Sequence, residues 1–175
     1  MGHALDTNLD FTLVSEHPVP LFMGELPREW TDIPARVVVN LCGVFPWGDP
    51  FGRIVMTLPM LDALEDRLMP GREEIERFVD GLHAWASNEP TYWHCHAGLN
   101  RSGIVVATYL HRHRGMRISD AIAHMRARRS PMVLCNSTFE RSLREWYGGP
   151  DEQEFTPFDL SFYVSERTGG REDWK

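Results

Sequence analysis

The stretch Trp93-His94-Cys95-His96-Ala97-Gly98-Leu99-Asn100-Arg101-Ser102-Gly103 decides both the fold and the chemistry expected of this chain. It starts in a short β-prone run, Thr91 to His94, and leads into residues 103–111, which are apolar on nearly every side. An apolar segment without a polar face is typical of a helix that is buried all round. The sequence therefore predicts a strand, then a tight loop, then a buried helix.

The loop between these two elements has the composition of an anion-binding site. The backbone N–H groups of residues 96–101 can point inward at one tetrahedral anion, and the N-terminus of the next helix adds positive potential. Arg101 closes the loop with a guanidinium that can bind two phosphate oxygens, and Gly98 lets the backbone turn sharply. The same dipoles favour a thiolate at Cys95. The loop thus predicts a charged nucleophile beside a phosphate pocket.

Short runs rich in Val and Ile alternate with amphipathic segments along the rest of the chain. Strands are expected at Leu21–Met23, Arg36–Leu41 and Ile54–Leu58, with a turn at residues 45–50 between the last two. Helices are expected from Arg72 to Asn88, from Ser119 as an N-cap, and from Ser137 to Gly148. This alternation predicts an α/β fold, with a central mixed β-sheet of about four or five strands flanked by helices.

Length and composition limit the class of protein. The chain has 175 residues, of which 42% are apolar, so one domain can bury a sufficient core without disulfides or metal. Three cysteines are too few for a disulfide framework and indicate a reducing compartment. The sequence starts with neither a signal peptide nor a run long enough to cross a bilayer. We expect a cytoplasmic location and no membrane partner.

The net charge of −7 argues against nucleic acid as a partner. Arginine is nevertheless concentrated in residues 101–145, where an anionic substrate could meet a local basic face. The arginines of the predicted helices are expected to form a solvated face, with a substrate-facing role for one or two of them as the alternative. They are Arg112, Arg114, Arg117, Arg126, Arg128 and Arg129.

With its flanks, the loop resembles the HC-x5-R-[ST] signature of the protein tyrosine phosphatase superfamily, and most closely its dual-specificity branch. Leu58-Pro59-Met60-Leu61-Asp62 is similar to the segment that carries the general acid in that family. Arg129-Ser130-Pro131, followed by Asn136 and Phe139, resembles the stretch before the family's last helix. The resemblance covers about residues 19–148. It leaves a lead-in over residues 1–18 and an acidic extension over 149–175, which either packs through its aromatic residues or forms a tail.

The resemblance implies a phosphatase-type fold and a role for each residue of the signature. Cys95 attacks phosphorus and forms a phosphocysteine, while Arg101 and the loop amides hold the phosphoryl oxygens. Asp62 protonates the leaving oxygen and then deprotonates the attacking water. Ser102 donates a hydrogen bond to the departing sulfur. The mechanism requires neither a metal nor another cofactor.

Supporting residues are implied in the same way, and some alternatives stay open. His94 would orient the loop and tune the thiolate, while Asn100 and Asn136 would fix its shape. Asp66 and Asp49 compete with Asp62 for the role of general acid. A metal site built from His94 and His96 around Cys95 is disfavoured, because adjacent residues of a strand point to opposite faces and the three side chains cannot all converge on one ion.

Cys42 ends the run Val39-Asn40-Leu41-Cys42, which resembles a strand end of the phosphatase and tensin homologue. In such relatives the cysteine can form a reversible disulfide with the nucleophile, so Cys42 is either a redox partner of Cys95 or a packed core thiol. Cys135 matches no such motif and is expected to be structural.

The function expected from the resemblance is hydrolysis of phosphate monoesters, namely phosphotyrosine together with phosphoserine and phosphothreonine, in a phosphorylated protein or another ester. Residues 98–103 also resemble a segment of RNA 5′-triphosphatases, but Ala97 stands where those enzymes carry a histidine. A phosphoinositide substrate is disfavoured because the loop has no lysine. A non-catalytic phosphate-binding module is the alternative outside enzymes. The sequence leaves the oligomeric state open.

Overall fold

The computed structural model of the protein describes residues 10–43 and 51–149. They contain a five-stranded sheet in the order β1-β2-β5-β3-β4, in which β1 runs antiparallel to β2 and the other pairings are parallel. The strands are β1 (Phe11–Ser15), β2 (Leu21–Gly24), β3 (Val37–Asn40), β4 (Ile54–Thr57) and β5 (Thr91–His94). The mixed sheet expected from the sequence is confirmed.

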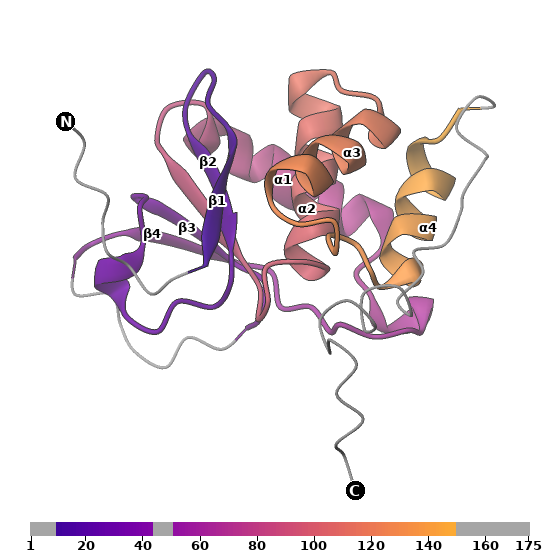
Figure 1. Cartoon of the computed structure of the whole chain (residues 1–175), viewed down its shortest axis with the longest axis horizontal. Coiled ribbons are helices and arrows are strands. Elements are labelled where there is room, and N and C mark those ends of the chain that lie inside the picture. The colour runs from indigo at the N-terminus through magenta and orange to yellow at the C-terminus, as the bar shows by residue number, and fades with distance from the viewer. Residues whose placement is uncertain (1–9, 44–50, 150–175) are drawn as a thin grey trace, which may run out of the picture.

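The described α-helices lie on one side of this sheet (Figure 1). They are α1 (Arg72–Ala86), α2 (Arg101–Arg114), α3 (Ile118–Arg128) and α4 (Ser137–Tyr147), accompanied by the short 3₁₀ helices η1 (Trp30–Asp32) and η2 (Asp66–Leu68). Every residue of α2 from Ser102 to Leu110 is buried, which explains why its sequence has no polar face.

The two faces of the sheet pack against different partners. Val37, Val39 and Trp93 belong to the large core that the sheet shares with the helices. Val38 and Tyr92 point the other way, into a smaller core that includes residue 30 of η1. Because successive side chains of a strand alternate between faces, β3 and β5 are buried on both sides and are apolar almost throughout.

Strand β5 is the element that positions the loop. It lies between β2 and β3 and pairs with both of them in parallel, so its backbone is hydrogen-bonded on both edges. The loop leaves the carboxyl end of β5 and α2 begins at Arg101. In open α/β sheets, ligands bind outside the carboxyl ends of the strands, and the loop occupies that position.

Two local expectations are wrong and two lie outside the described residues. Residues 11–15 form β1 instead of an irregular lead-in, because they complete the sheet beside β2. Ser119 lies inside the first turn of α3, whose N-cap residue is Arg117. The turn predicted at residues 45–50 and the acidic extension fall almost wholly outside the described residues.

Candidate active site

The loop from Cys95 to Arg101 is pressed against the end of β2. Gly98 has a φ of +67°, and a Cβ added there would lie 2.3 Å from the carbonyl carbon and oxygen of Gly24. Only glycine fits such a position. The N–H of Leu26 donates to the carbonyl of His96 at 3.0 Å. Loop carbonyls held outward in this way leave the loop N–H groups free to face an anion.

The nucleophile expected from the sequence lies at the buried base of this loop. Cys95 is 1% exposed, and its Sγ lies 3.4 Å from the Oγ of the fully buried Ser102. Arg101 donates from Nη1 to the carbonyl of Met60 at 3.3 Å. Its buried Nε has no hydrogen-bond acceptor among the described residues. This N–H can therefore donate to an oxyanion that binds in the loop.

The predicted general acid is tied directly to the loop. The two carboxylate oxygens of Asp62 accept one hydrogen bond each, from Nδ2 of Asn100 at 3.1 Å and from Nδ2 of Asn136 at 2.8 Å. Oδ1 of Asn100 in turn accepts from the N–H of Asn136 at 3.0 Å. The expectation that the two asparagines fix the shape of the site agrees with these contacts. Asp62 itself is solvent-exposed, as an acid that meets a substrate must be.

The side chains of the two rival acids are not among those that the structure describes. Asp66 begins η2, and its side chain is not among those described. Asp49 lies outside the described residues altogether. Asp62 is connected to the loop by its hydrogen bond from Asn100.

Comparison with known proteins places this geometry in a family. Residues 37–148 match the family described as dual specificity phosphatase, catalytic domain. The chain belongs to this family.

Two curated relatives of this dual specificity phosphatase domain come from Arabidopsis thaliana. The phosphatidylglycerophosphate phosphatase PTPMT1 is 28% identical over 137 residues, which are 73% of this chain and 40% of the relative. The phosphatidylglycerophosphate phosphatase PTPMT2 is 29% identical over 136 residues, which are 72% of this chain and 59% of the relative. The chain therefore spans about half the length of these relatives.

Solved structures share the fold of the dual specificity phosphatase domain at low sequence identity. Human DUSP28 has a TM-score of 0.64 and 19% identity, covering 79% of this chain and 93% of that one. The active form of Tk-PTP has a TM-score of 0.62 and 20% identity, covering 78% and 95%. A structure of PTPMT1 has a TM-score of 0.59 and 22% identity, covering 78% and 92%. The phosphatase-type fold expected from the sequence is confirmed.

His94 of the phosphatase domain is a neutral side chain at physiological pH. It is fully buried, and its ring stacks on that of Tyr92 with centroids 5.7 Å apart. Burial lowers its pKa from 6.5 to about 4. The charge of Arg101 also lowers this pKa, whereas a hydrogen bond to the Cys95 backbone raises it. A neutral imidazole can orient the loop as a hydrogen-bonding group, but it adds no charge beside the thiol.

Cys42 of the phosphatase domain follows β3, the strand next to β5. It is half-buried, and its N–H donates to Oδ1 of Asn40 at 2.9 Å. Burial raises the pKa of its thiol to about 11, with Arg101 lowering and Cys95 raising it. The N–H of Leu41, the residue before Cys42, donates to the carbonyl of His94 at 3.0 Å, so Cys42 lies beside the start of the catalytic loop; all three cysteines are free thiols. The disulfide with Cys95 stays a prediction.

Cys135 also lies nearer the catalytic loop than its sequence indicates. It is half-buried, and its Sγ donates to Oδ1 of Asn100 at 3.5 Å, the same oxygen that binds the N–H of Asn136. Burial raises the pKa of its thiol. A structural role agrees with this position, because a protonated thiol here completes the contacts of Asn100.

Arg129, in the stretch that resembles the family's segment before its last helix, lies against the outer side of the loop, a contact that the sequence did not predict. Its side chain is 3% exposed and donates to the carbonyl of Ala97 at 3.4 Å and to that of Gly98 at 3.5 Å. It also binds both carboxylate oxygens of Asp10, one of them at 2.9 Å. The expected solvated face is therefore wrong for Arg129, and also for Arg126, which pairs with a buried glutamate. The available signal in the sequence was Ser130-Pro131, because a proline there ends α3 and sets Arg129 apart from the arginines within the helix.

Two further classes of site are absent from the part of the chain that the structure describes. Within residues 10–43 and 51–149, no group of three or more His, Cys, Asp or Glu side chains is arranged to hold a metal ion. In the same residues, no helix combines the length and the apolar character that a membrane span needs.

Proposed function

We propose that the chain is a cysteine-dependent phosphatase that hydrolyses phosphate monoesters through a phosphocysteine intermediate. The observation that carries this proposal is the link between Asp62 and the loop through Asn100. Asn100 belongs to the loop that begins at Cys95. Its side chain therefore holds the acid next to the loop that carries the nucleophile. Phosphotyrosine, phosphoserine and phosphothreonine in proteins are the substrates that we expect first.

In the first step the Cys95 thiolate attacks phosphorus, and the bond from phosphorus to the leaving oxygen breaks. The loop N–H groups and the guanidinium of Arg101 bind the three phosphoryl oxygens while their charge redistributes. Protonated Asp62 donates its proton to the leaving oxygen, which departs as an alcohol or phenol. The product on the protein is a phosphocysteine, and Asp62 is left as a carboxylate.

In the second step a water molecule attacks the phosphocysteine. Asp62 takes one proton from this water, and the bond from phosphorus to sulfur breaks. The Cys95 sulfur leaves as a thiolate, and the hydroxyl of Ser102 can donate to it across the observed 3.4 Å. Release of inorganic phosphate restores the starting state, with Asp62 protonated again.

A chromogenic aryl phosphate tests this proposal with two variants that remove different atoms of the same contact. Cys95→Ser should abolish turnover, because a serine hydroxyl without a nearby base stays protonated. Ser102→Ala should keep the first step and slow the second, so that phosphocysteine accumulates and can be trapped by rapid acid quench. Substantial turnover by Cys95→Ser, or binding of vanadate by a parent protein that never turns over, would favour the non-catalytic module.

A lipid phosphate monoester is a second candidate substrate, supported by exposed leucines around the general acid. Leu61, Leu64 and Leu68 are 60%, 75% and 43% exposed, and they flank Asp62 in sequence. Large apolar side chains in such a group favour contact with an apolar partner. The curated relatives are named as phosphatidylglycerophosphate phosphatases. A lipid headgroup with a single phosphate monoester needs one loop arginine, so the missing loop lysine does not weigh against it.

Parallel assays on a phosphotyrosine peptide and on phosphatidylglycerophosphate in mixed micelles separate the two substrate classes. If lipid is the substrate, Leu64→Ser should raise KM for the lipid roughly tenfold, on the scale of one buried leucine side chain. The same change should leave KM for a soluble aryl phosphate unaltered. Trp85→Ser, at an exposed apolar residue of α1, is the matched control. Equal lipid kinetics in all three proteins would leave the protein substrate as the better assignment.

A further inference from the structure

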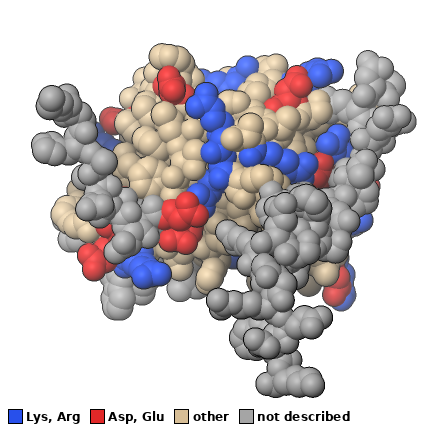
Figure 2. Space-filling model, in the orientation of Figure 1, with Lys and Arg blue, Asp and Glu red and all other residues tan. Residues whose placement is uncertain are grey.

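A cavity of about 370 Å³ lies where the chain leaving β1 meets the ends of α2 and α3. Its basic lining residues are His17, Arg114, His124 and Arg128. Leu110 and Met116 line part of its wall, and Glu16 also borders it. Figure 2 shows basic side chains gathered in a band along the line where the β1–β2 hairpin meets the helices. The cavity is open to solvent on one side, and its lining includes two arginines, Arg114 and Arg128, and one glutamate, Glu16.

Arg114, the last residue of α2, is the group whose hydrogen bonds are incomplete. Its Nε and Nη2 are buried and have no hydrogen-bond partner among the described residues. Its guanidinium carbon lies 5.3 Å from the centroid of the Tyr109 ring. A ring face offsets part of the cost of burying the charge, but it is a poor substitute for an oxygen acceptor. Donors of a buried cation left without an acceptor indicate a place for an oxyanion.

The surroundings of Arg114 are fixed by contacts within the fold. Nε2 of His124 donates to the carbonyl of Val14 at 2.6 Å, which ties α3 to β1 beside the cavity. Arg128 ends α3 and is exposed at the cavity rim. The C-termini of two helices attract cations, which accounts for arginines at both positions. No carbonyl oxygen of the described residues, at these helix ends or elsewhere, accepts a hydrogen bond from Nε or Nη2 of Arg114.

We propose that this cavity binds a phosphate-type dianion, either free phosphate or the phosphoryl group of an organic monoester, through Arg114 and Arg128. Planar guanidinium groups bind two oxygens of such an anion at once. Helix α2 has 14 residues and separates this cavity from Arg101 by about 20 Å. One phosphoryl group cannot reach both places, so the cavity is a second anion site, independent of the catalytic loop.

Nuclear magnetic resonance titration of the full chain with sodium phosphate tests the proposal, with sodium chloride at equal ionic strength as reference. Two sets of signals should saturate, one from the catalytic loop and one from the cavity, including the Nε–H of Arg114. Arg101→Ala should remove the first set and leave the second. Arg114→Gln should weaken the second by at least about tenfold and leave the first, since it removes a charge-assisted contact. Arg77→Gln, at an exposed arginine of α1, should change neither.

Each outcome bears on one site only. The proposal is overturned if the signals of the cavity respond equally to chloride and phosphate, or if they still respond to phosphate in Arg114→Gln. If Arg114→Gln does not fold, Arg128→Gln replaces it and must weaken binding several-fold. If the signals of the catalytic loop still respond to phosphate in Arg101→Ala, the role of Arg101 in catalysis is contradicted and the cavity proposal is not affected. Phenylphosphonate distinguishes the two sources: tighter binding than phosphate indicates an organic monoester, weaker binding indicates the free ion, and binding of neither overturns the site.

Discussion

The catalytic loop and the junction of α1, α2 and α4 both depend on polar side chains, but on different kinds. Around the loop the contacts join buried or neutral groups. Ser102 is fully buried beside Cys95, and Asp62 is held by the side-chain amides of Asn100 and Asn136. Asp62, Asn100 and Asn136 thus contact one another through hydrogen bonds in which Asp62 is the charged group and the asparagines are neutral.

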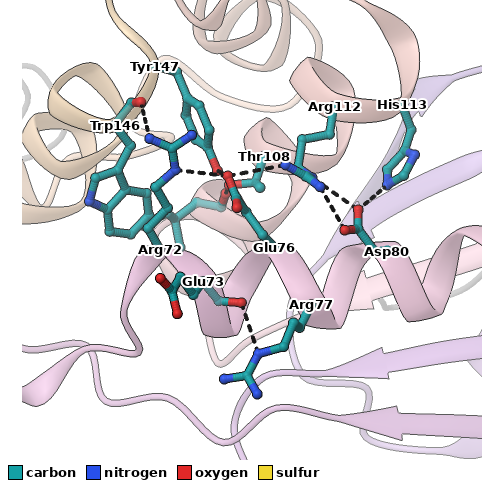
Figure 3. Close-up of polar contacts among 11 residues, drawn as sticks. Arg72, Glu73, Glu76, Arg77, Asp80, Thr108, Arg112, His113, Trp146 and Tyr147 are labelled. Atoms are coloured by element: carbon teal, nitrogen blue, oxygen red, sulfur yellow. Dashed lines mark hydrogen bonds and ion pairs between the residues drawn. The ribbon is translucent and has the colours of Figure 1, made fainter.

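At the junction the contacts join charges, and each charge has several partners (Figure 3). Glu76 accepts hydrogen bonds at 2.9 Å from both Arg72 and Tyr147, and it lies 3.2 Å from Arg112. Asp80 accepts from Arg112 at 3.0 and 2.7 Å. Exposed pairs of this kind contribute roughly 0.2–1 kcal/mol each. The junction therefore attaches helices through ion pairs with several charged partners, whereas the loop depends on hydrogen bonds between neutral side chains and one carboxylate.

The largest difference between the regions should come from Asp62→Asn at the loop. The change should lower kcat by roughly 10²–10⁴ for a substrate with a poor leaving group, the usual scale of general acid catalysis. Stability should change little, because an amide can keep one of the two hydrogen bonds. The measurement is kcat against pH, in which the basic limb should vanish.

A highly activated aryl phosphate is the control for Asp62→Asn, because its leaving group needs little protonation. The loss of kcat should be much smaller on that substrate. If Asp66→Asn reproduces the whole pattern and Asp62→Asn does not, the general acid has been assigned to the wrong residue.

The pH dependence of stability should also differ between the two regions. Unfolded His94 takes up a proton near pH 6.5 and folded His94 only near pH 4, so the unfolded state binds more protons between these values. Stability should thus fall by about 3 kcal/mol as the pH drops from about 6.5 to about 4, with no further loss from this group below. Urea denaturation of the parent and of His94→Asn measures the difference.

The junction should respond to acid with carboxylates instead. The hydrogen bond from Arg112 is the main cause that lowers the pKa of Asp80. For Glu76, burial acts to raise the pKa, but Arg72, Tyr147 and Arg112 together outweigh it and lower the pKa. A depressed carboxylate pKa means that its stabilising effect is present above the ordinary value and is lost below it. Burial also lowers the pKa of His113, which contacts Asp80, so a smaller loss below pH 6.5 remains in His94→Asn. A His94→Asn protein that loses as much stability as the parent between pH 6.5 and 4 would contradict this division.

Asn136 should give an intermediate effect, because it serves the site and a helix together. Its Oδ1 accepts from the N–H of Thr138 and caps α4, while its Nδ2 binds Asp62. Asn136→Ala should cost about 1 kcal/mol of stability through the lost cap. It should also lower kcat by roughly tenfold, since a hydrogen bond to a charged group contributes about 1.5 kcal/mol.

Asn136→Ser separates the two roles of this residue. A serine keeps an oxygen that can cap α4 but lacks the amide that reaches Asp62, so stability should stay near that of the parent while kcat falls. Parallel measurements of Tm and kcat on both variants decide the matter. Equal activity in Asn136→Ala and the parent protein would mean that Asn100 alone positions the acid.

The smallest effect should come from Glu76→Gln at the junction. Redundant partners and partial exposure limit the expected loss to about 1 kcal/mol or less, and kcat should not change. The loss should shrink further in 1 M salt, which screens exposed charges. Thermal denaturation at low and high salt measures it, with Asp120→Asn at the exposed pair with Arg117 as the matched control. A loss of several kcal/mol would show that the junction is as specific as the loop.

The sequence predicted the loop and Asp62 because their residues form a local pattern whose chemistry is readable without coordinates. The buried helix after the loop and the amphipathic α1 were predictable for the same reason, since periodicity is local. Arg129 and Asp10 were not, because their contacts join the two ends of the domain and depend on β1. Strand β1 itself has no strong pattern and becomes a strand only through its pairing with β2.

Cysteines and arginines show the same limit. Proximity of Cys42 to the loop followed from the order of the strands, whereas the contact between Cys135 and Asn100 depends on how the chain before α4 packs. Six arginines with similar local sequence turned out to differ, from the exposed Arg117 to the buried Arg129. Composition along a helix cannot distinguish them, because the neighbours that bury them come from elsewhere in the chain.

The position of β5 in the middle of the sheet has a consequence for how the chain acquires its activity. Thr91 at the start of β5 pairs with Leu21 of β2 and with Val37 of β3, both distant in sequence. Parallel strands of this kind must close long loops before they gain any contact, and such pairings form slowly. The helices can form early, but the anion-binding loop acquires its shape only when three separate segments have met. During refolding, catalytic competence should therefore return later than helical circular dichroism.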